Sequence, residues 1–100
     1  MIKHMLMWNL KESAEGQGRE ANAAKMKEIL EGLNGKIPGL LKLEIGMDLS
    51  RGATSREIAL YSEFETKEAL AGYIKHPAHV AAAAFVNKVA TDRVIVDFEV

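Results

Sequence analysis

The stretch His76-Pro77-Ala78-His79 divides the helical second half of the sequence and sets the order of its elements. A residue that precedes proline is driven out of the helical region, so a helix capped by Thr66 should run only to Ile74. Proline is equally suited to the first position of a helix, so a new helix begins at Pro77 and runs to about Val89. We therefore predict two consecutive helices that meet at a corner.

Hydrophobic alternation with a period of two residues predicts four strands. The strands are expected over Ile2–Leu10, Leu41–Leu49, Glu57–Phe64 and Val94–Val100. Apolar residues at three- and four-residue steps predict a further helix over Arg19–Leu33, after a polar loop over Lys11–Glu20. The resulting order, β-α-β-β-α-α-β, is that of a ferredoxin-like α+β fold whose second crossover helix is broken in two. We expect residues 1–100 to form one domain.

The first strand carries large apolar side chains on both of its faces. Alternation places Ile2, His4, Leu6, Trp8 and Leu10 on one face and Lys3, Met5, Met7 and Asn9 on the other. Helices can cover only one face of a four-stranded sheet, so the face that bears Met5 and Met7 needs another cover. We expect a second copy of the chain to provide it, in a homodimer whose sheets pack face to face.

Length, charge and composition exclude several classes of protein. One hundred residues suffice for one small domain, and a net charge of −1 provides no basic surface for nucleic acid or anionic membranes. The absence of cysteine excludes a disulfide framework and thiolate chemistry. The run Met5–Trp8 is too short for the core of a secretory signal, and Val80–Val86 is far too short to span a bilayer. We expect a soluble, cytoplasmic protein that binds neither nucleic acid nor membranes.

Tyr73 and His79 flank the corner between the two helices and are the first candidates for a catalytic role. His79 lies in the first turn of its helix, where the positive end of the helix dipole disfavours an imidazolium and should lower the pKa of His79. A neutral imidazole can act as a general base, and the hydroxyl of Tyr73 can donate a hydrogen bond to a developing oxyanion. The structural alternative is that His79 bonds the N-terminal region of its helix and Tyr73 is a core aromatic with a solvated hydroxyl.

His4 is a third candidate for a catalytic role. It shares one face of the first strand with Leu6 and Trp8, which are candidate ligand-binding residues. A buried imidazole needs a hydrogen-bonding partner, so His4 either contacts a substrate or bonds across to the third helix. Leu6 and Trp8 would form the apolar wall of a ligand pocket, although plain core packing of Trp8 is the simpler interpretation.

His76 is the third histidine and is expected to line the same region as a ligand-binding residue. Its spacing from His79, together with His4, allows a zinc site of three imidazoles as an alternative. His76 precedes the proline, however, and is expected to point away from the face of His79, with no acidic partner nearby in the sequence. We therefore predict no metal site and no cofactor.

Several segments of this chain together resemble one known family, the stress-responsive dimeric α/β-barrel proteins. The block around His76-Pro77-Ala78-His79 is the most specific part of the resemblance, which spans essentially all 100 residues. The resembling segments are Ile2-Lys3-His4, Ile37-Pro38-Gly39, Glu63-Phe64-Glu65, Tyr73–Val80 and Val96-Asp97-Phe98. The resemblance implies a ferredoxin-like monomer that pairs into an eight-stranded barrel.

A plant branch of that family carries out polyketide cyclisation by an aldol-type closure. There, the histidine that matches His79 is the base, assisted by the tyrosine that matches Tyr73, and the matches of His4 and His76 line the same region. The present sequence departs from that branch at Ile58, where the branch has a further histidine. It also departs at residues 23 and 24, two alanines where the branch has aromatic side chains.

Two classes of function are compatible with this sequence. The first is an enzyme that carries out cofactor-free proton transfer on a small, apolar carbonyl compound, in the manner of a polyketide cyclase, a lyase or an isomerase. The second is a non-catalytic stress-response protein whose dimer binds a hydrophobic metabolite. Tyr73 with His79 beside an apolar wall motivates the first, and the sequence leaves both classes open.

Overall fold

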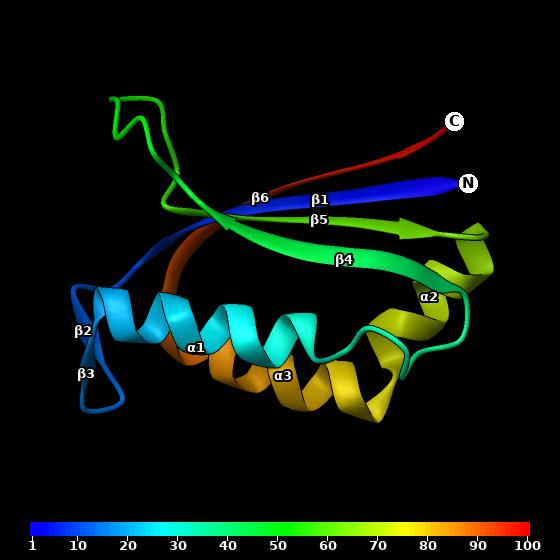
Figure 1. The fold of residues 1–100 in the computed structure, drawn as a ribbon, viewed down its shortest axis with the longest axis horizontal. Helices are drawn as coiled ribbons and strands as arrows, with labels where there is room; N and C mark the ends of the chain where they lie inside the picture. The colour runs from blue at the N-terminus through cyan, green and yellow to red at the C-terminus, as the bar shows by residue number, and fades with distance from the viewer.

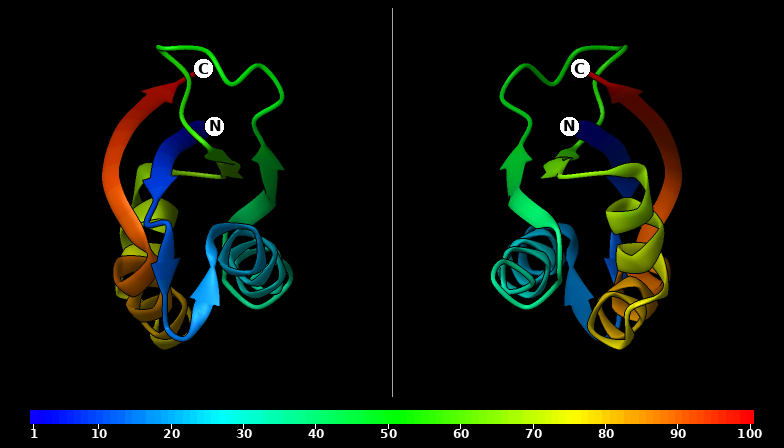
Figure 2. Two further views of the ribbon diagram at one scale, coloured as in Figure 1. Left: turned by 90° about the vertical axis from the view of Figure 1, so that its left-hand side faces the viewer. Right: turned by 90° about the vertical axis from the view of Figure 1, so that its right-hand side faces the viewer.

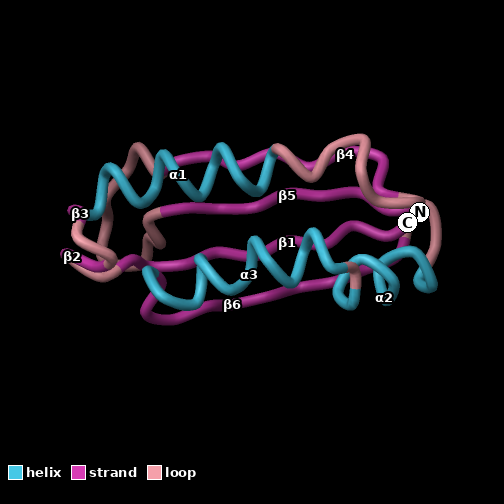
Figure 3. The backbone as a smooth tube through the Cα atoms, turned by 90° about the horizontal axis from the view of Figure 1, so that it is seen from below, coloured by secondary structure: helices cyan, strands magenta, loops and turns pink.

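The computed structural model describes all 100 residues of the chain. A four-stranded antiparallel sheet in the order β4-β5-β1-β6 has one face covered by three helices (Figures 1 and 3). The predicted ferredoxin-like α+β order is confirmed. No helix of the chain is long and apolar enough to cross a membrane. The strands of the sheet are β1 (Ile2–Leu10), β4 (Leu40–Met47), β5 (Ile58–Phe64) and β6 (Ala90–Glu99), and the helices are α1 (Arg19–Glu31), α2 (Lys67–Lys75) and α3 (Pro77–Val89).

The core lies between the helices and the sheet, and strand register decides which side chains enter it. Leu6 of β1 is paired with Leu60 of β5, so both side chains point to the helix side of the sheet. Helix α1 buries Ala23, Met26 and Leu30, which recur at three- and four-residue steps. The even-numbered residues of β1 therefore meet the helices, as the alternation predicted.

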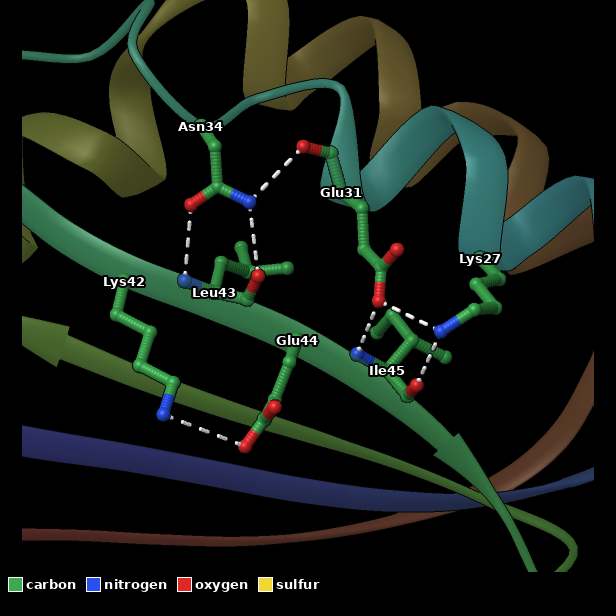
Figure 4. A network of polar contacts seen from close by, with 7 residues as sticks. All are labelled: Lys27, Glu31, Asn34, Lys42, Leu43, Glu44 and Ile45. Atoms are coloured by element: carbon green, nitrogen blue, oxygen red, sulfur yellow. Dashed lines mark hydrogen bonds and ion pairs between the residues drawn. The ribbon is translucent and has the colours of Figure 1, made fainter.

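Side chains from α1 and the turn that follows it protect the edge strand β4 (Figure 4). The side chain of Asn34 accepts a hydrogen bond from the Leu43 amide at 2.9 Å and donates one to the Leu43 carbonyl at 2.8 Å. Glu31 accepts from the Ile45 amide at 3.0 Å, and Lys27 donates to the Ile45 carbonyl at 2.8 Å. Because these backbone groups are already bonded, this edge is not open to pairing with another strand.

The segment predicted as a polar loop after β1 contains a short hairpin, β2 (Ser13–Ala14) and β3 (Gln17–Gly18). Its turn residue Gly16 has a φ of 76°, which glycine adopts without steric cost. The buried side chain of Asn22 donates a hydrogen bond to the Ala14 carbonyl at 3.0 Å and so ties the hairpin to α1. Strands of two residues are too short for alternation to reveal them.

Several details of the elements differ from the predicted ones. Helix α1 ends at Glu31 rather than at residue 33, and its C-cap residue Gly32 keeps a helical φ of −63°. A bulge in β4 turns Leu41 outward, where it is 51% exposed, and Leu43 and Ile45 are the buried residues of this strand. Strand β6 begins at Ala90 rather than at Val94, because its pairing with β1 continues past a second bulge.

The face of the sheet opposite the helices is uncovered and is apolar over most of β1 and β6, whereas its part over β4 and β5 carries Lys42, Glu44 and Glu63. We call it the open face. Register places Met5 beside Tyr61 and Val96 on this face, and Met7 beside Val94. Met7, Val94 and Val96 are between 37% and 56% exposed. The loop between β4 and β5 rises on the same side of the sheet (Figures 1 and 2). Both faces of β1 therefore carry apolar groups, and only one of them is covered by the helices.

Candidate functional site

A cavity of about 90 Å³ lies between the sheet and the helices. Five of the six predicted site residues line it, namely His4, Leu6, Trp8, Tyr73 and His79. The remaining wall comes from Leu30, Leu60, Ala83, Val86, Asn87 and Arg93. For comparison, an apolar cavity of about 150 Å³ in another protein holds one benzene molecule. The present cavity therefore suits a small molecule or one end of a larger one.

The corner between α2 and α3 brings Tyr73 and His79 together. His76 is extended, with φ −64° and ψ 134°, so the chain changes direction there and Pro77 begins the next helix. The rings of Tyr73 and His79 consequently lie 4.3 Å apart between centroids, at an angle of 44°. Tyr73 also packs on Phe64 at 4.9 Å and is only 1% exposed. Burial raises the pKa of the Tyr73 hydroxyl to about 12, so at neutral pH this group is a hydrogen-bond donor.

The tautomer of neutral His79 follows from its hydrogen bond. Its Nδ1 lies 3.1 Å from the carbonyl oxygen of Ile74, and because a carbonyl can only accept, Nδ1 carries the proton. Nε2 then holds a free lone pair. Burial lowers the pKa of His79, with a further lowering from nearby His4 and an opposing contribution from the Ile74 carbonyl. The predicted direction is correct, and burial rather than the helix dipole is its main cause.

His4 is 5% exposed, and its partner is Asp97 of β6 rather than a residue of the third helix. The two residues are paired across the neighbouring strands β1 and β6, so their side chains project from the same face. His4 Nδ1 donates to the Asp97 carboxylate at 2.5 Å, so Nε2 is an acceptor in the neutral form of His4. The His4 ring lies 6.0 Å from the ring of Tyr73 between centroids, so the Tyr73 ring is near both imidazoles.

Asp97, which contacts His4, was not among the predicted site residues. It lies in a strand whose apolar residues alternate with polar ones, and in isolation it reads as a solvent-facing position. Only the antiparallel pairing of the first and last strands brings it beside His4. In a ferredoxin-like sheet the first and last strands are antiparallel neighbours. Aligning the two predicted strands in this way could have placed Asp97 beside His4.

His76 does not line the cavity, so the expectation that all three histidines share one region is wrong. Its Nδ1 accepts a hydrogen bond from the Ala78 amide at 3.1 Å and thereby caps α3. It faces a separate surface groove that also includes Gly39 and Glu65. The three imidazoles of the zinc alternative do not converge, and no group of three His, Asp or Glu side chains is placed to hold a metal ion.

Comparison with known proteins decides the family. Residues 2–100 match the family described as the stress responsive A/B barrel domain, abbreviated Dabb. The chain belongs to the Dabb family. An uncharacterized protein from Streptomyces coelicolor is 32% identical to it over 100 residues, which is 99% of each chain. The family expected from the sequence is thereby confirmed.

Two solved structures extend the comparison to the fold of this Dabb protein. A dimeric protein of unknown function from Bacteroides fragilis, with a ferredoxin-like fold, has a TM-score of 0.84 and 31% identity, over 99% of this chain and 95% of that one. A hydroxynitrile lyase from Passiflora edulis shares the fold with a TM-score of 0.80 at 14% identity, over 97% and 90% of the two chains. The second of these likenesses concerns the fold alone.

Proposed function

We propose that this Dabb protein is a homodimer that carries out cofactor-free acid–base chemistry on a small carbonyl compound, bound in the cavity of each subunit. The observation that carries the proposal is the grouping of one buried phenol with two imidazoles, each of which has its Nδ1 engaged elsewhere. In its neutral form each imidazole therefore has Nε2 available, and the phenol has a proton to share. A donor beside two acceptors is what proton transfer next to a carbonyl requires.

Tyr73 and His79 have complementary roles in this proposal. Nε2 of His79 removes a proton from the carbon next to the substrate carbonyl, so a C–H bond breaks and an N–H bond forms. The electron pair moves to the carbonyl oxygen, and the Tyr73 hydroxyl donates a hydrogen bond to the resulting oxyanion. Burial supports both roles, because it lowers the pKa of His79 and raises that of Tyr73 to about 12. One group therefore stays a neutral base while the other stays a donor.

The pair His4 and Asp97 supports the same chemistry from the other side of Tyr73. A carboxylate bonded to Nδ1 fixes the tautomer and orientation of an imidazole and stabilises the positive charge that develops when it takes a proton. The side chain of Asp97 is 39% exposed, whereas that of His4 is 6% exposed. The pair thus connects the cavity with solvent, and protons can enter or leave along this route. Asp97 acts here as a positioning residue.

The size of the cavity limits the substrate. Its apolar wall, formed by Leu6, Trp8, Leu30 and Leu60, suits a short hydrocarbon segment. Pockets that hold drug-sized ligands measure about 300–1,000 Å³, well above the present volume of about 90 Å³. A small ketone, aldehyde or hydroxy ketone is therefore favoured over an extended polyketide chain. The related fold of a hydroxynitrile lyase adds cyanohydrins to the compounds to be screened.

The homodimer part of the proposal rests on the open face. An apolar sheet face that includes Met5, Met7 and Val96 needs a cover, and a self-complementary face can be covered by a second copy of the chain. The Bacteroides fragilis protein of 31% identity is dimeric, which supports this assembly. Each cavity lies on the helix side of its own sheet, so both sites remain accessible in such a dimer. A cytoplasmic location remains part of the proposal.

A substrate screen with three variants tests the chemistry. His79→Ala should abolish turnover, and Tyr73→Phe should reduce it by on the order of 10²–10³-fold, because one oxyanion donor is lost. His76→Asn is the matched control, since it changes a histidine outside the cavity and asparagine can still cap α3. Turnover that survives His79→Ala would contradict the proposal. Ligands that bind the cavity but are never converted would instead favour a non-catalytic binding protein.

A further inference from the structure

The cavity carries a second polar end that the proposed chemistry does not use. Arg93 of β6 and Asn87 of α3 both line the cavity, and both are exposed, so they stand at its mouth. We propose that they form an anchor for a carboxylate, so that the substrate is a small keto acid rather than a neutral carbonyl compound. This inference rests on the function proposed above and specifies the substrate class of the same site.

Arg93 is a cation without a partner in the protein. Two of the other arginines form ion pairs, Arg19 with Glu57 at 2.9 Å and Arg56 with Asp92 at 3.1 Å. Asp92, the acidic residue next to Arg93 in the chain, is thus already engaged. The side chain of Arg93 makes neither an ion pair nor a hydrogen bond within the protein, although its guanidinium offers five N–H donors. Its pairing with Trp8 across the strands directs it to the helix side of the sheet, where the cavity lies.

The other groups at the cavity favour an anion as well. No aspartate or glutamate lines it, so the only permanently charged side chain in its wall is that of Arg93. The side-chain amide of Asn87 makes no hydrogen bond within the protein and can donate to a carboxylate oxygen. A planar guanidinium matches the two oxygens of a carboxylate, and such charge-assisted pairs are among the stronger hydrogen bonds.

Strand register also indicates how far apart the two ends of the substrate are. His4, at the acid–base end of the cavity, is paired with Asp97, and Trp8 is paired with Arg93 at the cationic end. The two ends are therefore separated by four residues along both β1 and β6. Four residues of a strand span about 13 Å, and the Arg93 side chain can shorten this distance by reaching inward. Leu6 lies between the two ends and provides an apolar contact. These features match a carbonyl group joined to a carboxylate by a short hydrocarbon chain.

A matched pair of probes tests the inference. The dissociation constants of 4-oxopentanoate and its neutral amide, 4-oxopentanamide, are measured by NMR titration of the protein, with the histidine resonances reporting on the cavity. The wild-type protein should bind the acid roughly tenfold more tightly than the amide, as expected for hydrogen bonds to a charged group. Arg93→Gln should abolish this preference and leave amide binding unchanged. Arg51→Gln, which alters an exposed arginine outside the cavity, should keep it.

The outcomes separate the carboxylate anchor from the proposed function. Equal binding of acid and amide to the wild-type protein would overturn the anchor while leaving the small-molecule site intact. A preference for the acid that survives Arg93→Gln would overturn it as well. If neither probe shifts the resonances of His4 and His79, the proposed carbonyl site itself is wrong, and the carboxylate anchor fails with it.

Discussion

Removal of the Tyr73 hydroxyl should make the stability of the protein less sensitive to alkaline pH. The folded protein keeps this hydroxyl protonated up to a pKa of about 12, because burial opposes the charged phenolate. The unfolded chain loses the same proton near the ordinary value of 10.0. Between these values the folded state binds more protons than the unfolded state, so the free energy of unfolding falls as the pH rises from 10 to 12.

The size of this effect follows from the two pKa values. A difference of two units corresponds to about 2.7 kcal/mol once the pH passes both of them. At pH 11.5 most of this has been lost, about 2 kcal/mol relative to pH 9. Tyr73→Phe keeps the ring that packs on Phe64 and removes the titrating group, so the variant should lack this part of the pH dependence. Lysines titrate in the same range, but their contribution is common to both proteins and cancels in the difference.

Urea denaturation followed by circular dichroism at pH 9 and pH 11.5 measures the effect. Tyr61→Phe is the matched control, because it removes the other tyrosine, on the open face, and should retain the wild-type loss of stability. If Tyr73→Phe and the wild-type protein lose the same free energy of unfolding, Tyr73 is not the buried donor described here. The assignment of an oxyanion-binding role to its hydroxyl would then fall.

Three further predictions concern the assembly, the backbone and the base. Met5→Glu should convert the proposed dimer to an 11 kDa monomer or unfold the protein, because the substitution would bury an unpaired charge in the interface at the open face. Light scattering that shows an unchanged dimer would contradict the proposed interface. Gly39→Ala should lower the free energy of unfolding more than Gly35→Ala, because both glycines have a φ of 80° but only at Gly39 would the new Cβ lie 2.4 Å from the Cβ of Ala69. Equal urea midpoints for the two variants would refute this. NMR titration should give His79 a pKa below 6.5, and a pKa above 6.5 would contradict its role as a neutral base. The contribution of His79 to the free energy of unfolding should be fully present above pH 6.5 and should decline at lower pH, because the unfolded chain takes up the proton more readily than the folded protein.

Local rules predicted most of the fold from the sequence. Alternation along β1 separated the helix-facing residues from the open face, and both faces are observed as expected. Pro77 predicted the corner between α2 and α3, because its effects on the preceding residue and on a helix start depend only on neighbouring atoms. The bulge at Leu41 was not predictable in this way, since it depends on how β4 pairs with β5.

The candidate site was predicted where it depends on neighbours in sequence and missed where it depends on strand pairing. Tyr73 and His79 were found because the helical corner between them could be derived. Asp97 and Arg93 were not found, because their places beside His4 and Trp8 come from the pairing of the first and last strands. His76 was included because it is near His79 in sequence, but its extended backbone directs it into a different groove.

The most direct test of the proposed chemistry is the exchange of protons for deuterium next to a ketone carbonyl. The protein is incubated in D₂O with 4-oxopentanoate or with butanone, and ¹H NMR follows the loss of the α-proton signals. A positioned base and oxyanion donor should accelerate exchange by on the order of 10²-fold or more over free imidazole at the same concentration, and His79→Ala should remove the acceleration. Exchange of both ketones at the rate of free imidazole, or an acceleration that persists in His79→Ala, would contradict a catalytic site formed by Tyr73 and His79.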